Sequence, residues 1–263
     1  MARLLLALFV VLNVTLKSTL TLVLETPRNG NVGISGGDII PIEAAPYMAA
    51  LFLENEQWCG ATVIDDQFVL TAAHCLMSNN TEEWKILVGS DQLNTEGVFI
   101  DVEKILCHEK YVFPEVNHDI CLLKLKENIP FECFWNIEKI ALPENNRPIY
   151  EGELASVTGW GETGLACQVS HELRKALVPI VANECCRRVH PNVTDDMICA
   201  GDKHHNFCLG DAGGPLVIRN RRNTAILIGV ASQDAASCRT YPGVYTRVAS
   251  YLSWIQNTIQ SNK

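Results

Sequence analysis

Short apolar runs separated by turn-forming residues make up most of the chain. The runs are rich in Val, Ile and Leu and are bounded by clusters of Gly, Pro, Asn and Asp, a pattern that predicts strands. The clearest of them cover residues 61–70, 120–125, 154–157, 216–218 and 226–230. Together they are typical of an antiparallel β-barrel or β-sandwich. The sequence shows no internal repeat and no low-complexity stretch.

The apolar positions change period near the carboxy-terminal end. Residues 248–259 place four apolar side chains at helical spacing, namely Val248, Leu252, Ile255 and Ile259. An apolar stripe of this period predicts an amphipathic α-helix that packs one face on the core.

The amino-terminal residues have the pattern of a secretion signal. Arg3 precedes an apolar run at residues 4–12 that is too short to span a bilayer, and polar residues follow it. We therefore expect a signal peptide at residues 1–18, a leader or pro-segment at residues 19–33, and a soluble extracellular product. No later stretch is apolar and long enough to predict a transmembrane helix.

The composition limits both the fold and the partners. With 263 residues, 48% of them hydrophobic, the chain can bury a sizeable core, and all-β folds of this length commonly form one unit. The formal net charge of −9 argues against nucleic acid or an anionic membrane as a partner, because both are bound through dense Lys and Arg. Two small basic clusters, at residues 187–188 and 219–222, are interpreted as solvated loops.

The chain contains eleven cysteines, an odd number. In a secreted chain cysteines suggest disulfides, and at least one thiol must here stay free or pair with another chain. Cys121 lies in an apolar run, where a small buried thiol explains it as well as a bridge does. Asn79 and Asn192 each begin an Asn-x-Thr pattern, so both are candidates for N-glycosylation.

Three segments carry candidate chemistry, and they follow one another along the chain. Residues 71–75 read Thr-Ala-Ala-His-Cys, residues 119–123 read Asp-Ile-Cys-Leu-Leu, and residues 210–215 read Gly-Asp-Ala-Gly-Gly-Pro. They resemble the signature segments of chymotrypsin/trypsin-like (S1 family) serine proteases, whose third segment reads Gly-Asp-Ser-Gly-Gly-Pro. Four further segments support the resemblance, namely residues 34–37, 158–161, 198–201 and 242–248. The resemblance covers the whole chain after the leader.

This resemblance implies an all-β fold of two packed six-stranded antiparallel β-barrels, with a cleft between them and a carboxy-terminal α-helix. It also implies three disulfides: Cys59 with Cys75, Cys186 with Cys199, and Cys208 with Cys238. The sequence leaves the pairing of the other five cysteines open, namely Cys107, Cys121, Cys133, Cys167 and Cys185.

In the mechanism of the family, a serine hydroxyl attacks the scissile carbonyl, a histidine takes its proton, and a buried carboxylate orients the histidine. The resemblance gives the last two roles to His74 and Asp119, but Ala212 stands in the place of the serine. Loss of this nucleophile costs about 10⁶-fold in kcat in a comparable case. We therefore expect an inactive, vestigial triad, in which Gly210 and the amide of Ala212 keep the oxyanion-hole position.

The expected specificity pocket also departs from the family. The resemblance places Asn206 at its base, where trypsins have an aspartate, so selection for Arg or Lys would be lost. Ser232, Gln233 and Asp234 fall on the wall and mouth of the pocket. Gln233 replaces the usual tryptophan and Asp234 the usual glycine, although an extra residue before Cys238 shifts this alignment by up to one position. These departures favour natural loss of function over an engineered alanine.

Activation of the expected kind is unsupported by the sequence. Zymogens of the family are usually cut after Lys or Arg, and the new terminus pairs with an aspartate that matches Asp211. Here Gly33 precedes Ile34, and a cut after the nearest upstream basic residue, Arg28, would leave residues 29–33 attached. A cut by a protease of other specificity would restore the activated geometry, so the sequence leaves cleavage before Ile34 open.

The function that we expect is that of a secreted pseudoprotease that acts by binding. The sequence resembles most the inactivated mite serine protease homologues related to group 3 allergens, which implies secretion, with the gut lumen as a site, and inhibition of host complement. We therefore expect protein partners, with complement components among them, and no nucleic acid, membrane, metal or cofactor. In particular, neither the adjacent His204 and His205 nor the loop at Ser90 and Asp91 has the pattern of a metal site.

Two alternatives remain open. If Ala212 is not the native residue, the chain is a trypsin-like digestive serine endopeptidase. The second alternative is a non-catalytic scaffold of a proteolytic cascade, like insect protease homologues, although the sequence shows no regulatory domain ahead of Ile34.

Overall fold

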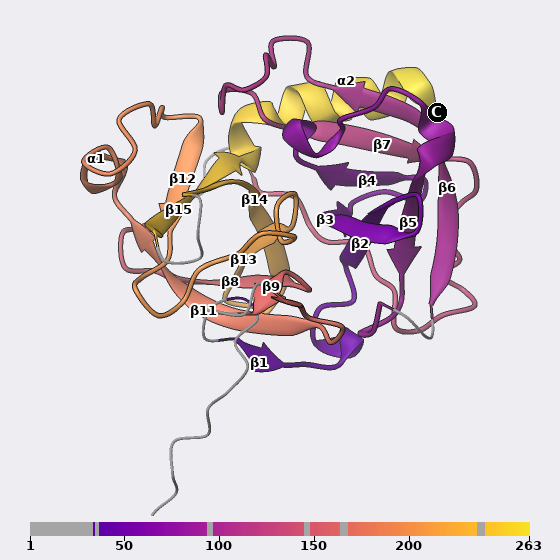
Figure 1. Cartoon of the computed structure of the whole chain (residues 1–263), viewed down its shortest axis with the longest axis horizontal. Helices are drawn as coiled ribbons and strands as arrows, with labels where there is room; N and C mark the ends of the chain where they lie inside the picture. Colours follow the sequence, from indigo (N-terminus) through magenta and orange to yellow (C-terminus); the bar gives the residue numbers. More distant parts are fainter. Residues whose placement is uncertain (1–33, 35–36, 94–96, 145–147, 164–167, 236–239) are drawn as a thin grey trace, which may run out of the picture. The chain divides into compact units, whose positions relative to one another are not determined.

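Two closed six-stranded antiparallel β-barrels form the structure (Figure 1). The computed structural model describes residue 34 and residues 37–93, 97–144, 148–163, 168–235 and 240–263, and every structural statement below concerns these residues. The expected signal peptide at residues 1–18 and the leader at residues 19–33 lie outside them. No helix in the described part of the chain has the length and apolar character needed to cross a membrane.

The first barrel is built from the first half of the described chain. Apolar residues fill it, and in its first strand Met48, Ala49, Ala50 and Leu51 are fully buried. In order around the barrel its strands are β2 (Met48–Leu53), β3 (Glu56–Val63), β4 (Phe68–Thr71), β7 (Cys121–Leu125), β6 (Val98–Cys107) and β5 (Trp84–Val88). Pairing of β2 with β5 closes the ring.

The second barrel is a ring of six strands closed by the pairing of β11 with β8. In order they are β8 (Leu154–Gly159), β11 (Arg174–Val181), β12 (Met197–Ala200), β15 (Thr240–Arg247), β14 (Ala225–Ala235) and β13 (Pro215–Arg219). Outside the ring, β1 (Asp38–Ile39) pairs with β11, and β9 (Glu162–Thr163) pairs with β10 (Gln168–Val169). The predicted fold class is therefore confirmed.

One predicted run, residues 61–70, is wrong as a single strand. It covers the end of β3 and most of β4, which form an antiparallel hairpin. The amides of Ile64 and Asp65 both donate to the carbonyl of Phe68, which closes the turn. The polar pair Asp65 and Asp66 marks this turn inside an otherwise apolar run, because such residues favour turns over strand interiors.

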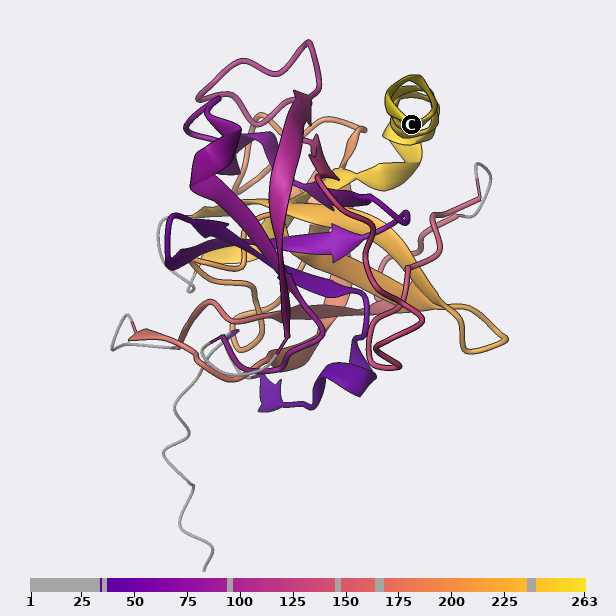
Figure 2. The same cartoon turned by 90° about the vertical axis from the view of Figure 1, so that its right-hand side faces the viewer.

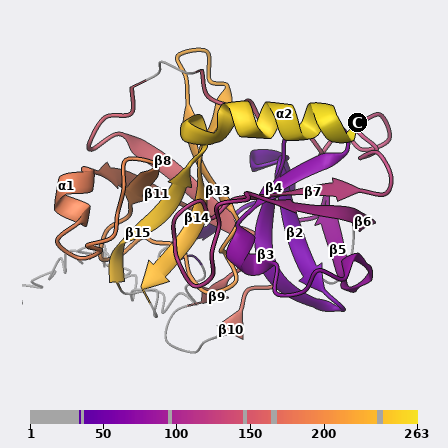
Figure 3. The same ribbon diagram turned by 90° about the horizontal axis from the view of Figure 1, so that it is seen from above.

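The predicted carboxy-terminal helix is confirmed. It starts as a 3₁₀ turn, η5 (Val248–Tyr251), and continues as α2 (Leu252–Asn262), which lies across the strands of the first barrel (Figure 3) and is viewed almost along its axis in Figure 2. Val248, Leu252 and Ile255 are buried in the core of the first barrel, and Ile259 packs against it. The other helices are short: η1 (Ile42–Ala44), η2 (Ala73–Cys75), η3 (Thr81–Glu83) and α1 (Asn183–Cys186).

Two of the three expected disulfides are confirmed, Cys59–Cys75 and Cys186–Cys199. Cys208 is also disulfide-bonded, but its expected partner, Cys238, lies outside the described residues, as does Cys167. Cys133 and Cys185 are free and exposed.

A further disulfide joins Cys107 to Cys121, so of the two interpretations that the sequence left open for Cys121 the bridge is the correct one. The two residues lie directly opposite each other on β6 and β7. Sequence separation alone does not reveal this pairing, because it depends on the register of two strands.

Removal of this disulfide is expected to destabilise the first barrel. The bridge closes a loop of sequence separation 14, and a loop of this size stabilises the fold by about 2–3 kcal/mol in the chain-entropy account. We expect Cys107→Ser/Cys121→Ser to lower the free energy of unfolding by that amount in urea titrations. Cys133→Ser, at an exposed free thiol, is the matched control and should change it by less than about 0.5 kcal/mol. Equal effects in the two proteins would contradict the prediction.

Candidate functional site

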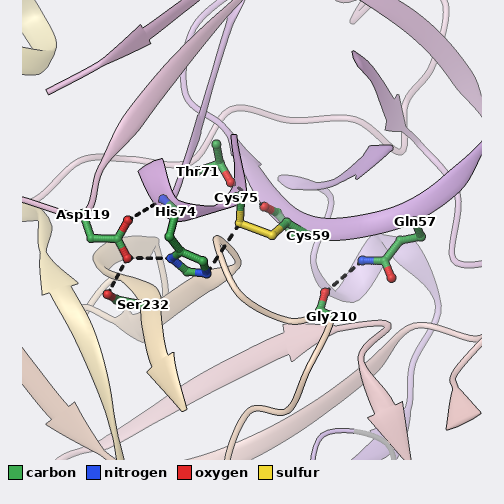
Figure 4. Close-up of a disulfide and its surroundings, with 9 residues drawn as sticks. Gln57, Cys59, Thr71, His74, Cys75, Asp119, Gly210 and Ser232 are labelled. Carbon is green, nitrogen blue, oxygen red and sulfur yellow. Dashed lines mark hydrogen bonds and ion pairs between the residues drawn. A yellow bond between two sulfur atoms is a disulfide. The ribbon is translucent and has the colours of Figure 1, made fainter. Parts of the chain in front are cut away.

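His74 and Asp119 lie together at one end of the first barrel (Figure 4). His74 is in η2, directly after β4, and Asp119 precedes β7, which pairs with β4. The Nδ1 atom of His74 is 2.7 Å from Oδ2 of Asp119, and the backbone amide of His74 donates to Oδ1 at 2.9 Å. The carboxylate is 2% exposed and the imidazole 30%. This is the geometry of an orienting carboxylate behind a general base.

The second barrel also holds Asp119. The hydroxyl of Ser232, in β14, donates to Oδ2 of Asp119 at 2.5 Å, and Thr246, in β15, donates to its backbone carbonyl at 2.8 Å. The Ser232 hydroxyl thus points to the carboxylate, a contact that our assignment of Ser232 to the pocket wall did not include. Neither this contact nor that of Thr246 was predicted, because no local sequence signal identifies either.

Two phenols, the partly buried Tyr111 and the buried Tyr251, lie near this carboxylate without adding charge. Burial raises the pKa of Tyr111 well above its usual value, and the nearby Asp119 raises it further. Burial also raises the pKa of Tyr251 to about 12, with a smaller contribution from Asp196. Both phenols therefore stay protonated at neutral pH, and neither places a second negative charge beside Asp119.

The loop that carries Ala212 is fixed by both barrels. The carbonyl of Ala212 accepts from the amide of Gly60 at 2.7 Å, and the amide of Gly213 donates to the carbonyl of Ala231 at 2.7 Å. Gly213 has a φ of +78°, and a Cβ there would overlap Thr71 and the Gly60 carbonyl, so only glycine fits. Ala212 therefore has a defined place in the loop, and its side chain is a methyl group.

Two backbone amides remain available in this loop. Neither Gly210 nor Ala212 donates its amide hydrogen to any other residue that the structure describes, whereas the amide of Asp211 donates to the carbonyl of Cys208. The carbonyl of Gly210 accepts from Nε2 of Gln57 at 2.8 Å, which anchors this end of the loop (Figure 4). A pair of such amides is what an oxyanion hole requires.

Asp211 belongs to the same loop and is buried, with 2% of its surface exposed. Its carboxylate accepts from the amides of Gly161 and Cys208, at 2.7 and 2.9 Å. A Cβ at Gly159 or Gly161 would overlap this carboxylate, so both positions require glycine. Ile34 is fully buried in the core of the second barrel, whereas the residues before it lie outside the described part of the chain.

A buried aromatic ring lies next to Asn206, the residue expected at the base of the specificity pocket. Asn206 is fully buried there, and Phe207, the next residue, is 1% exposed. The Phe207 ring packs edge-on against Tyr245, with 5.0 Å between ring centroids. A Cβ at Gly243 would clash with both Asn206 and the Phe207 ring, so these side chains occupy the space beside that glycine. We had not predicted Phe207, although a large apolar residue directly after the pocket-base position was a readable signal.

Gln233 lies beside a cavity of about 450 Å³ rather than in this buried base. The pairing of β14 with β15 shifts register on both sides of Gln233, between Ala231 and Gln233 and again before Ala235. The side chain of Asp234 lies outside the described residues, so its predicted place at the pocket mouth stays a prediction.

One group of potential metal ligands occurs in the described part of the chain, formed by Cys59, His74 and Cys75. The two sulfur atoms are joined in a disulfide. Metal binding by cysteine requires thiolates, so this group does not hold a metal in its oxidised form. His204 and His205 lie on a turn, where both of their backbone amides donate to Asp202.

Two β-barrels that hold a histidine–aspartate pair beside a glycine-rich loop define the chymotrypsin-like class of proteins. Comparison with known protein families identifies the family within this class. Residues 34–255 match the family model described as Trypsin, and the chain belongs to this family.

Known relatives are similar over most of their length. The chain is 35% identical to trypsin 5G1 of Aedes aegypti over 85% of this chain and 84% of that protein. It is 32% identical to the vitellin-degrading protease of Bombyx mori, over 88% and 87% of the two chains. It is 34% identical to the clotting factor G beta subunit of Tachypleus tridentatus, over 85% and 78%.

Proposed function

We propose that this protein is a secreted, proteolytically inactive member of the trypsin family that acts by binding. The observation that carries the proposal is Ala212, which stands where the family has its nucleophilic serine, beside a correctly arranged His74 and Asp119. A methyl group has no lone pair with which to attack a carbonyl and no acidic proton for the histidine to remove. The two amides of the loop then have no tetrahedral intermediate to stabilise.

The buried base of the specificity pocket supports the same proposal independently. A functional pocket must admit the side chain that precedes the scissile bond. Here Phe207 is 1% exposed and occupies the space beside Gly243. Binding of a large substrate side chain would require this ring to leave the core. Loss of the nucleophile and filling of the pocket are two separate obstacles to proteolysis.

The histidine and aspartate have a structural role that survives the loss of chemistry. Asp119 is buried and accepts hydrogen bonds from His74 and Ser232. Hydrogen bonds to a charged group contribute about 1.5–3 kcal/mol each, and a buried carboxylate without partners is costly. Their presence therefore does not argue for retained catalysis.

We propose a host proteolytic cascade such as complement as the target, with the gut lumen as a site of secretion. The resemblance to inactivated mite homologues motivates this choice. A relative named as a clotting factor subunit also places a cascade component within the same family. A protein with the fold of a cascade protease, but without its chemistry, can occupy the partners of the active enzyme.

Lysis of antibody-sensitised red cells by normal serum tests this proposal. We expect the purified secreted protein to protect the cells in a dose-dependent manner at micromolar concentration, whereas the heat-denatured protein should not. Unchanged lysis over that range would overturn the complement target and leave an inactive homologue with another partner. Faster lysis would instead favour the scaffold alternative.

The endopeptidase alternative has one observation in its favour, since two relatives are named as a trypsin and as a vitellin-degrading protease. It requires that Ala212 is not the native residue. Under this alternative, serine at position 212 restores hydrolysis of peptides without any other change, whereas the proposed inactive homologue should remain unable to cleave them.

A further inference from the structure

A cavity of about 450 Å³ opens beside the His74–Asp119 site. Its lining comes from three segments that are far apart in the sequence: the loop Pro114, Glu115, Val116 and Asn117, then Asn192, and finally Gln233. Asn117 is two residues from Asp119, and Gln233 follows Ser232, which donates to Asp119. Two of the lining segments are therefore continuous with the residues that form or hold the His74–Asp119 site.

Asn192 is held at the rim of this cavity by a short, well-anchored turn. The residue is exposed, whereas Val193 is 5% exposed and anchors the turn in the core. The amide of Val193 donates to the carbonyl of His190 at 3.1 Å, and Asn183 donates to the carbonyl of Thr194 at 2.9 Å. Asn192 also begins the Asn-Val-Thr pattern required for N-glycosylation.

The lining of the cavity has the chemistry of a carbohydrate site. Asn117 and Gln233 supply amides that donate to and accept from hydroxyl groups, and the carboxylate of Glu115 accepts from them. Pro114 and Val116 add small apolar surfaces. Among the lining residues Glu115 is the one that carries a charge, so a neutral polyhydroxylated ligand fits better than a cation or an anion.

We propose that Asn192 carries an N-linked glycan whose first sugars occupy this cavity and cover the cleft beside His74. In the transfer, the side-chain nitrogen of Asn192 forms a bond to the anomeric carbon of the first sugar. The bond from that carbon to the diphosphate of a lipid-linked oligosaccharide breaks, and the amide gives up one proton. The proposal rests on the secretory route in the proposed function, and it is independent of the complement target.

The consequence is that protein partners meet this molecule outside the cleft. A glycan over the cavity excludes an extended peptide from the groove that Gln233 borders. The second candidate, Asn79, is also exposed, but it lies between η2 and η3 and does not line this cavity. The two patterns therefore form a matched pair, one over the cavity and one away from it.

The test uses the secreted full-length product with Glu115→Cys, which introduces a thiol into the lining of the cavity. A maleimide carried on a polyethylene glycol chain labels the exposed thiols, and peptide mass spectrometry compares labelling at position 115 with that at the free, exposed Cys133. We expect a glycan on the Asn192 peptide, and labelling at position 115 about tenfold slower than in the additional variant Asn192→Gln, because the glycan restricts access to an otherwise exposed loop.

Three controls make the result decisive. Asn79→Gln should leave the labelling rate at position 115 unchanged. The small reagent N-ethylmaleimide should also react more slowly at position 115 with the glycan than without it, because the sugars occupy the cavity itself, and equally fast in both proteins at Cys133. Enzymatic removal of glycans from the folded protein replaces Asn192→Gln if that variant does not fold. An Asn192 peptide without glycan, or a labelling rate at position 115 that does not depend on Asn192, would overturn the proposal whatever the outcome of the lysis assay.

Discussion

Ala212→Ser is expected to restore a reactive serine without restoring peptide hydrolysis. Nδ1 of His74 lies 2.7 Å from Oδ2 of Asp119, which is the arrangement of a general base with its orienting carboxylate. A serine hydroxyl at position 212 should therefore react with a small phosphonofluoridate, a reagent that needs no specificity pocket. Peptide substrates with Arg, Lys or aromatic side chains should remain uncleaved, because the buried Phe207 ring occupies the space beside Gly243 at the expected base of the pocket. Label incorporation measured by intact mass, and hydrolysis of a panel of chromogenic peptides, separate the two effects.

Removal of the ring should then open the pocket. In Ala212→Ser/Phe207→Ser we expect hydrolysis about 10²-fold above that of Ala212→Ser, since misplacement of a substrate by about 1 Å costs a factor of this size. Circular dichroism checks that the double variant is folded, because deletion of a buried aromatic ring costs about 3–5 kcal/mol.

The matched control for both variants is Ala212→Ser/His74→Ala, which should lose the phosphonofluoridate label because the general base is gone. Hydrolysis by Ala212→Ser alone at the level of an active trypsin would contradict the expectation. That result would favour the endopeptidase alternative and an alanine that is not native.

Asp211→Ala is expected to be among the most destabilising single changes in the second barrel. The carboxylate is buried and accepts from the amides of Gly161 and Cys208. Its removal leaves both buried amides without an acceptor, and each unsatisfied donor costs about 1–3 kcal/mol of stability. The free energy of unfolding should therefore fall by about 4 kcal/mol in urea titrations.

Asp66→Ala is the matched control for this change. Asp66 pairs with Lys139 at 2.9 Å, but both side chains are about half exposed, and exposed ion pairs contribute at most about 1 kcal/mol. Comparable losses in the two variants would show that the buried amides around Asp211 have other partners in solution.

The sequence predicted the fold through local patterns and ordered motifs. Apolar runs bounded by turn residues marked the strands, and the 3.6-residue period marked the carboxy-terminal helix. The runs did not resolve the hairpin inside residues 61–70, because Asp65 and Asp66 interrupt it only briefly. The Cys107–Cys121 bridge was left open, since it requires the register of β6 on β7, and neither strand specifies that register by itself.

The residues of the candidate site that lie within short sequence motifs were predictable from the sequence. His74, Asp119 and Ala212 lie within short signature segments. The contacts that hold them do not, because Ser232 is 113 residues from Asp119 and Gln57 is 153 residues from Gly210. Such contacts exist only after the two barrels have formed and packed. Phe207 was missed for another reason, since a motif comparison asks whether a residue matches and not whether its ring fills a pocket.

The position of Asp119 between the barrels has a consequence for how the molecule unfolds. Its carboxylate accepts from His74 in the first barrel and from Ser232 in the second, and its carbonyl accepts from Thr246. A barrel that opened alone would leave this buried charge without part of its partners, so partial unfolding is costly. The histidine–aspartate site thus couples the two halves into one cooperative unit. Selection on folding alone is therefore enough to keep these residues, whether or not the chain catalyses a reaction.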